Sequence, residues 1–76
     1  MADVHWNVKF GEPHRVTAKP EAGVELIVES LPPSKRWVGR LIVNGKAAWN
    51  GFGFKLSSEA KNITEGRYRG WRKRQL

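Results

Sequence analysis

Residues 36–54, RWVGRLIVNGKAAWNGFGF, decide the fold of this 76-residue chain. Two runs rich in β-branched and aromatic residues, 36–43 and 46–54, are separated only by Asn44-Gly45. An Asn-Gly pair between such runs is the strongest short-range signal for a β-hairpin, because a type I′ turn needs positive φ at both central residues. The stretch therefore predicts two antiparallel strands joined by a two-residue turn.

The register of this hairpin predicts which side chains share a face. A two-residue turn places Trp37 opposite Phe52 on one face, where we expect them to be core, and Arg40 opposite Trp49 on the other. Neither face is polar, and three explanations remain open: the chain covers both faces, the hairpin pairs with another subunit, or one face binds a ligand. The Arg40/Trp49 face is the candidate for a ligand, because a guanidinium over an indole recurs where bases stack.

Alternating apolar and polar residues predict further strands before this hairpin. The alternation is clearest over residues 4–10 and 24–31, and a shorter run covers residues 15–19. Turns are expected at Gly11-Glu12-Pro13 and at Pro32-Pro33-Ser34, because proline cannot donate a hydrogen bond to a strand ladder.

After the hairpin the pattern changes to that of one short helix over residues 57–65. Leu56, Ala60 and Ile63 fall on one side of it at helical spacing, and Gly66 is expected to end it. The order of elements predicts a mainly β fold: a small antiparallel five- to six-stranded sheet, or an SH3-like barrel, with this helix near its end.

The domain organisation expected from length is simple. We expect residues 1–66 to form a single β-rich domain and residues 67–76 to form a basic C-terminal strand or tail. A sheet this small has edges to protect, so a homodimer is an open alternative.

The composition excludes several classes of function. The chain has no cysteine and two histidines, so neither a disulfide framework nor a closed zinc site is expected. No apolar run approaches the roughly 20 residues that span a bilayer, and the first residues lack the features of a signal peptide, which favours a cytoplasmic protein without a membrane partner. No spacing of serine, histidine and carboxylate residues suggests a catalytic triad. We therefore predict no enzymatic activity, no cofactor and no metal.

Positive charge is concentrated in the second half of the chain. Residues 1–34 carry three Lys/Arg against five Asp/Glu, a net charge of −2, whereas residues 35–76 carry eleven against two, a net charge of +9. Such asymmetry indicates a polyanionic partner. Basic residues interleaved with aromatic ones supply charges for phosphates and rings for bases. The predicted nucleic-acid-binding residues are Lys35, Arg36, Arg40, Lys46, Trp49, Lys55, Arg67, Tyr68, Arg69, Trp71, Arg72, Lys73 and Arg74.

The sequence thus predicts a small basic nucleic-acid-binding protein that grips phosphates with its C-terminal Arg/Lys cluster and stacks bases on exposed aromatics, with single strands favoured over duplex. Gly51-Phe52-Gly53-Phe54 resembles the core of the RNP1 motif of cold-shock domains and RNA-recognition motifs, in which strand aromatics stack bases. The resemblance covers these four residues, and Asn50 and Lys55 depart from the motif on either side, so the chain is assigned to neither family. The alternative is a phage- or plasmid-type accessory or inhibitor protein, which would bind an acidic host protein through its Trp-rich sheet face or a strand edge.

Overall fold

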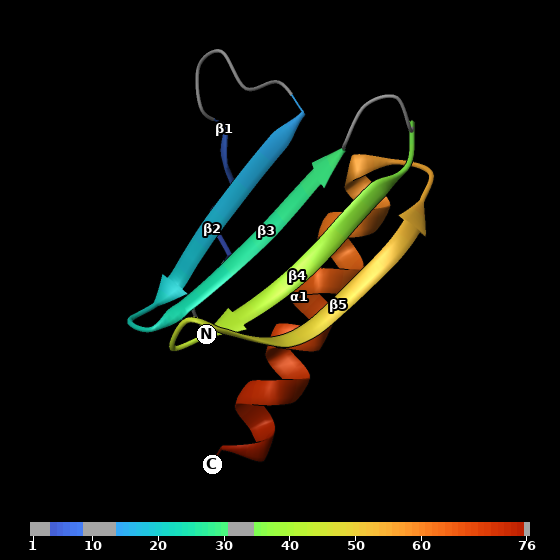
Figure 1. Ribbon diagram of the computed structural model, residues 1–76. Coiled ribbons are helices and arrows are strands. Elements are labelled where there is room, and N and C mark those ends of the chain that lie inside the picture. The colour runs from blue at the N-terminus through green and yellow to red at the C-terminus, as the bar shows by residue number, and fades with distance from the viewer. Residues whose placement is uncertain (1–3, 9–13, 31–34, 76) are drawn as a thin grey trace.

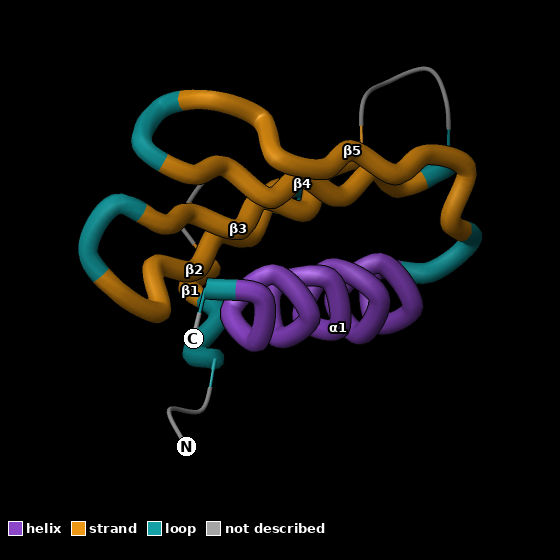
Figure 2. The backbone as a smooth tube through the Cα atoms, turned by 90° about the horizontal axis from the view of Figure 1, so that it is seen from below, coloured by secondary structure: helices purple, strands orange, loops and turns teal. Residues whose placement is uncertain are grey.

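The computed structural model describes residues 4–8, 14–30 and 35–75, which form an antiparallel sheet with one helix on one of its faces (Figure 1, Figure 2). The elements are β1 (Asn7–Val8), β2 (Arg15–Glu21), β3 (Val24–Ser30), β4 (Trp37–Val43), β5 (Lys46–Phe54) and α1 (Ser57–Arg74). The strands lie side by side in chain order, so β1 and β5 are the two edges. The predicted mainly β class with five antiparallel strands is confirmed. The sheet is open, and the SH3-like barrel is not confirmed.

Of the N-terminal residues 4–8 that the structure describes, Asn7 and Val8 pair with β2. Trp6, which the alternation placed in the same strand, instead packs against the core beside α1. Residues 9–13 and 31–34, which contain two of the predicted turns, lie outside the described residues.

The turn predicted at Asn44-Gly45 is confirmed. Asn44 has φ 50° and Gly45 has φ 81°, the positive values that a type I′ turn requires. Val43 pairs with Lys46 across it. The backbone N–H of Asn44 donates a hydrogen bond to the carbonyl oxygen of Gly23 at 2.7 Å, so this turn is tied to the turn between β2 and β3.

A first register shift in the hairpin overturns the predicted Arg40/Trp49 pair. Between Leu41 and Ile42 the pairing slips by one residue, so that Leu41 lies opposite Trp49 and Arg40 lies opposite Asn50. Because one slipped position moves a side chain to the other face, Trp49 joins Leu41 on the helix-covered face while Arg40 lies on the uncovered one.

A second register shift overturns the predicted pairing of Trp37 with Phe52. Trp37 lies opposite Phe54 instead, and both pack at the edge of the core. Gly53 adopts φ 80° at this irregularity, a conformation that glycine adopts at little cost. As a result Phe52 is 71% exposed rather than buried.

The core lies between the sheet and α1. Buried side chains alternate along β2 and β4, as expected when one face of a sheet is covered, whereas in β3 the consecutive residues Leu26, Ile27 and Val28 are all buried. Burying a Val or Leu side chain fully contributes about 1.5–3 kcal/mol. The buried hydrophobic residues of the two core clusters are Val16, Ala18, Val24, Leu26, Val28, Leu41, Ala60 and Tyr68.

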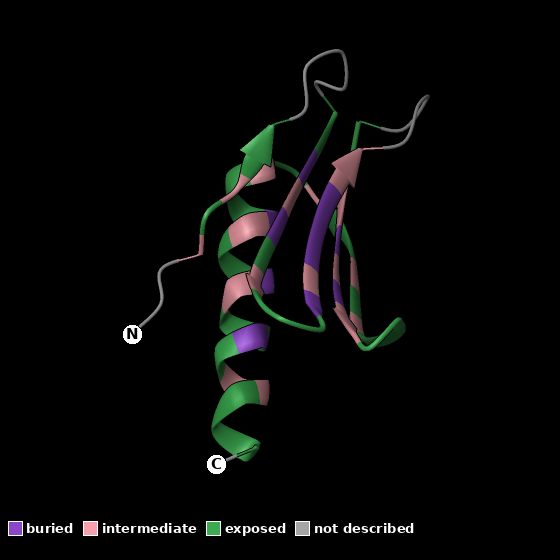
Figure 3. Ribbon diagram, turned by 90° about the vertical axis from the view of Figure 1, so that its left-hand side faces the viewer, coloured by how far each residue is buried: buried purple, intermediate pink, exposed green. Residues whose placement is uncertain are grey.

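The helix is twice as long as predicted. It continues through Gly66 to Arg74, so the segment expected to be a strand or tail is its second half. Thr64 and Tyr68 extend the buried stripe that starts at Ala60, one helical turn at a time. This burial outweighs the roughly 1 kcal/mol that an interior glycine costs. The last turns of α1 project beyond the end of the sheet (Figure 1, Figure 3).

The helix approaches the sheet closely at Gly39 of β4. A Cβ atom placed on Gly39 would lie 2.2 Å from Oγ1 of Thr64, so any side chain there would push α1 away. Thr64 is fully buried, and its hydroxyl has no hydrogen-bond partner among the described residues. Glycine at position 39 is therefore what allows this helix to seat on this sheet.

Candidate nucleic-acid interface

The aromatic residues proposed to stack bases lie at the interface between sheet and helix. Tyr68 is 2% exposed, and Trp71 stacks on it with the ring centroids 6.3 Å apart. The indole of Trp49 lies over Gly51, where an added Cβ would come within 2.5 Å of the ring. Tyr68 is buried, and Trp49 and Trp71 are partly buried against the core, so none of the three presents a fully exposed ring to a base.

Phe52 is the exposed aromatic side chain of the described region. It lies on the sheet face that α1 leaves uncovered, away from the basic helix. A regular hairpin predicts Phe52 in the core, whereas Gly51 and Gly53 on either side of it indicate an irregular strand.

The helix has two flanks, distinguished by the strand that each approaches. The guanidinium of Arg72 lies beside Glu21 of β2, whereas that of Arg67 lies over Trp49 of β5. Helical spacing then sorts the neighbouring side chains. We call the side carrying Lys61, Glu65, Arg69 and Arg72 the β2 flank, and the side carrying Ile63, Arg67, Gly70 and Arg74 the β5 flank.

On the β2 flank each arginine lies next to a carboxylate. Arg69 Nη2 is 3.6 Å from Oε2 of Glu65, and Arg72 Nε is 3.6 Å from Oε1 of Glu21. Glu65 also accepts a hydrogen bond from the indole N–H of Trp6. These carboxylates offset the arginine charges locally and tie the helix to the N-terminal half of the chain.

Tyr68 adds a buried anchor beside this flank. Its hydroxyl donates a 2.5 Å hydrogen bond to Oε1 of Glu21. Burial raises the pKa of Tyr68, and the hydrogen bond to Glu21 and the negative charge of that carboxylate raise it further, against the opposing effect of Arg72. The phenol is therefore held in its neutral form, in which it can donate.

The β5 flank has a different chemical environment. The guanidinium carbon of Arg67 is 5.6 Å from the centroid of the Trp49 ring, a cation–π arrangement that holds the side chain without cancelling its charge. No acidic residue occurs from Lys35 to Ser58, so β4 and β5 supply no carboxylate. Glu59 is the described carboxylate on this side of α1, and it lies eight positions, about 12 Å along the axis, before Arg67.

Further cations lie at both ends of β5. Lys35, Arg36 and Lys55 line a hollow of about 290 Å³ where β5 ends and α1 begins. Lys46 is exposed at the opposite end of the strand. Because nine residues of β5 span roughly 30 Å, these cations mark the two ends of the strand, and no charged residue lies between Lys46 and Lys55.

The remaining cationic candidates are dispersed. Arg40 lies on the uncovered sheet face, 3.5 Å from Oε1 of Glu29, and Lys73 is exposed in the last turn of α1. The structure thus groups Lys35, Arg36 and Lys55 at one end of β5 and places Lys46 at the other end, and it puts Arg40 on the opposite face of the sheet from α1. Sequence reasoning missed the partners of the other arginines, Glu21 and Glu65, because the pairing depends on where the long helix crosses the sheet.

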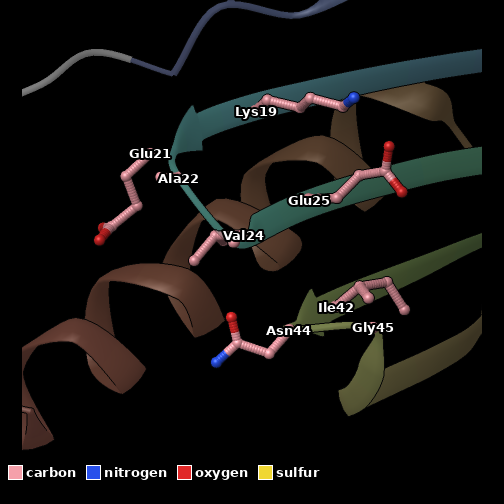
Figure 4. A pocket seen from close by; sticks show the side chains of 9 residues that line it. Lys19, Glu21, Ala22, Val24, Glu25, Ile42, Asn44 and Gly45 are labelled. Atoms are coloured by element: carbon pink, nitrogen blue, oxygen red, sulfur yellow. The ribbon is translucent and has the colours of Figure 1, made fainter.

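A larger hollow of about 540 Å³ lies between the two hairpin turns, bordered by Lys19, Glu21 and Glu25 among others (Figure 4). Its charge is mixed, and Glu21 is already engaged by Tyr68 and Arg72. This hollow therefore offers no comparable site for an anion.

Comparison with known proteins gives no family for this chain, which matches no family model, no curated protein and no solved structure. Within the described ranges, no cluster of three or more histidine or carboxylate side chains is placed to hold a metal ion. The helical part of those ranges also lacks a stretch long and apolar enough to cross a membrane.

Proposed function

We propose that this chain binds nucleic acid by contacting its phosphate backbone with the exposed cations of α1, without stacking bases. The observation that carries the proposal is how aromatic and basic side chains are arranged around the C-terminal half of α1. Its aromatic residues face the sheet, whereas its basic residues point outward from a folded helix. The exposed basic residues are Arg67, Arg69, Arg72, Lys73 and Arg74.

Arginine suits this role because its planar guanidinium can form two parallel hydrogen bonds with a phosphate. A helix also fixes the backbone of these residues, so less conformational entropy is lost on binding than in a disordered tail. The end of α1 projects past the sheet (Figure 3), where a rod-shaped ligand can approach it.

The preference for single strands that we expected from the sequence depended on free aromatic rings. With Trp49, Tyr68 and Trp71 packed at the core, that preference loses its basis. Duplex DNA presents one charge per roughly 1.7 Å of its axis, and each phosphate contact releases more counterion there than on a single strand. We therefore propose that duplex is bound at least as tightly as single-stranded nucleic acid.

A titration of the full chain against duplex DNA, single-stranded DNA and RNA of equal length tests this proposal. The slope of log K against log salt concentration is expected to be about −3 to −4 for the duplex, corresponding to about four phosphate contacts. Absence of binding, or binding that ignores salt, would contradict the proposal. Tighter binding to single strands with strong Trp quenching would contradict the absence of stacking.

Charge substitutions test the helix better than truncation does. Deleting residues 67–76 would remove Tyr68 and Trp71 from the core, so loss of binding would report loss of fold. The paired change Lys73→Gln/Arg74→Gln removes two positive charges from exposed positions of α1. Arg15→Gln/Lys19→Gln removes the same charge from exposed positions of β2 and is expected to affect the salt slope less.

A second candidate follows from the β5 edge. β5 has nine residues and pairs only with β4 among the described strands, so an extended segment of an acidic protein can add to it. Symmetric pairing of two β5 strands would bring the lysines of two copies together, which disfavours a homodimer through this edge. A polyglutamate peptide that bound more tightly than duplex DNA at equal salt would favour the protein partner.

A further inference from the structure

We infer that the nucleic acid lies along the β5 flank of α1 and the adjoining β5 edge, and that the β2 flank is not part of the interface. This inference rests on the proposed function and names the surface that performs it. The two flanks carry arginines of the same helix half at similar exposure, so residue type does not distinguish them. The residues next to these arginines do distinguish the two flanks.

A phosphate that approached the β2 flank would meet carboxylates as well as guanidinium groups. Glu65 and Glu21 lie 3.6 Å from Arg69 and Arg72, so each arginine contributes little net charge at that surface. The same two carboxylates also accept hydrogen bonds from Trp6 and Tyr68, which hold them in place beside the arginines. The arginines of the β2 flank therefore already have carboxylate partners within the folded chain.

A phosphate that approached the β5 flank would meet an arginine held by a neutral ring. The Trp49 indole is fixed over Gly51 of the sheet, and Arg67 lies across it. A ring quadrupole attracts the guanidinium while leaving its N–H donors available around the edge. Arg74 follows two helical turns later on the same flank, about 10 Å along the axis.

The lysines next to the β5 edge, Lys35, Lys46 and Lys55, lengthen this basic surface. We call these lysines, Arg36, Arg67 and Arg74 together the track. α1 and β5 are neighbours in the chain and run in opposite directions (Figure 1). The hollow lined by Lys35, Arg36 and Lys55 therefore lies at the start of α1, and Lys46 lies toward the same end as Arg74. The 18 residues of α1 cover about 27 Å. Over that length a duplex carries roughly 16 phosphate charges on its two strands.

The matched pair Arg67→Gln/Arg74→Gln and Arg69→Gln/Arg72→Gln tests the inference. Each variant removes two positive charges from the same helix half by the same substitution. The β5-flank pair is expected to flatten the salt slope for duplex DNA by about 1.8, the contribution of two phosphate contacts. The β2-flank pair is expected to flatten it by less than half that amount.

A second variant keeps the test independent of the Arg67–Trp49 contact. Lys46→Gln/Lys55→Gln changes exposed positions outside the helix, and it is expected to flatten the slope while circular dichroism and Tm remain those of the native chain. A native fold with an unchanged slope for this variant would overturn the track.

The outcomes separate this inference from the proposed function. Equal slope changes for both arginine pairs, or a larger change for the β2-flank pair, would overturn the inference while nucleic-acid binding stood. Native protein that bound no nucleic acid would overturn both. An acidic peptide that bound this flank more tightly than duplex DNA would show that its occupant is a protein segment and would also overturn the inference.

Discussion

The two flanks of α1 carry the same residue type among different neighbours. On the β2 flank, Arg69 and Arg72 lie beside carboxylates that also accept hydrogen bonds from Trp6 and Tyr68. On the β5 flank, Arg67 lies on a neutral ring. The difference teaches that the number of basic residues in a helix says less about binding than the neighbours that neutralise them or leave them charged.

The origin of this difference is visible along the chain. Acidic residues occur in β2 and β3 and are absent from residues 35–58. Because the sheet keeps the strands in chain order, a charge asymmetry along the sequence becomes an asymmetry across the molecule. The β2 flank of α1 therefore lies toward the strands that carry acidic residues, and the β5 flank lies toward the strands that carry none.

The largest effect is expected from removing the anchor beside the β2 flank. Tyr68→Ala should destabilise the chain by about 3–5 kcal/mol, because a large buried ring and a hydrogen bond to Glu21 are lost together. Ile63→Ala on the β5 flank should cost less than about 1 kcal/mol, since Ile63 is 39% exposed. Urea unfolding of both variants measures this difference, and equal losses would contradict the burial of Tyr68 between α1 and the sheet.

A smaller effect is expected from glycine substitutions. Gly39→Ala should destabilise by about 1–3 kcal/mol, because the added Cβ meets buried Thr64 and overpacks the seat of the helix. Gly70→Ala on the β5 flank should instead stabilise by about 0.5–1 kcal/mol, since nothing lies within 4 Å of its added Cβ and alanine favours a helix. Thermal unfolding distinguishes the two signs. A destabilising Gly70→Ala would mean that the β5 flank is already covered.

The pH dependence of stability isolates the Tyr68 anchor, because Tyr68 is the only tyrosine of the chain. Its pKa is raised in the folded state, so its stabilising contribution is fully present below the unfolded value of about 10 and is lost as pH rises through the folded value. Below pH 10, Tyr68→Phe should be less stable than the native chain by about 1–2 kcal/mol. Urea unfolding between pH 7 and 11 should show this gap closing above about pH 10, and a constant gap would count against the Glu21 hydrogen bond.

The smallest effect on stability is expected from Arg67→Gln. Loss of an exposed cation–π contact should cost about 0.5–1 kcal/mol, and the change should still weaken binding to duplex DNA. Arg69→Gln should cost a similar amount, as exposed ion pairs do, with little effect on the salt slope. Equal effects on binding would remove the distinction between the flanks.

Much of this architecture could be predicted from sequence. The Asn44-Gly45 turn was predicted because two-residue hairpin turns restrict φ strongly, and the antiparallel order followed from short connections. The sides of Trp49 and Phe52 could not be predicted, because a single bulge reverses every side chain beyond it and two shifts occur in this hairpin. Gly53 is the residue in the sequence that indicates the second register shift.

The length of α1 and the partners of its arginines were harder to predict. Gly66 signals a helix end locally, whereas the burial of Tyr68 against the sheet continues the helix past it. The basic residues of the proposed interface can be chosen from the sequence by type and clustering, but the division into two flanks depends on which strand each side approaches. That information is tertiary, since Glu21 is 51 positions from Arg72 in the chain.

Backbone amide shifts of the full chain during titration with a short DNA duplex distinguish binding at the two flanks. We expect the shifts to concentrate at Lys46, Lys55, Arg67, Gly70 and Arg74, while Glu65, Arg69 and the uncovered sheet face around Phe52 stay nearly unchanged. Shifts concentrated on the β2 flank or on the uncovered sheet face would contradict this expectation.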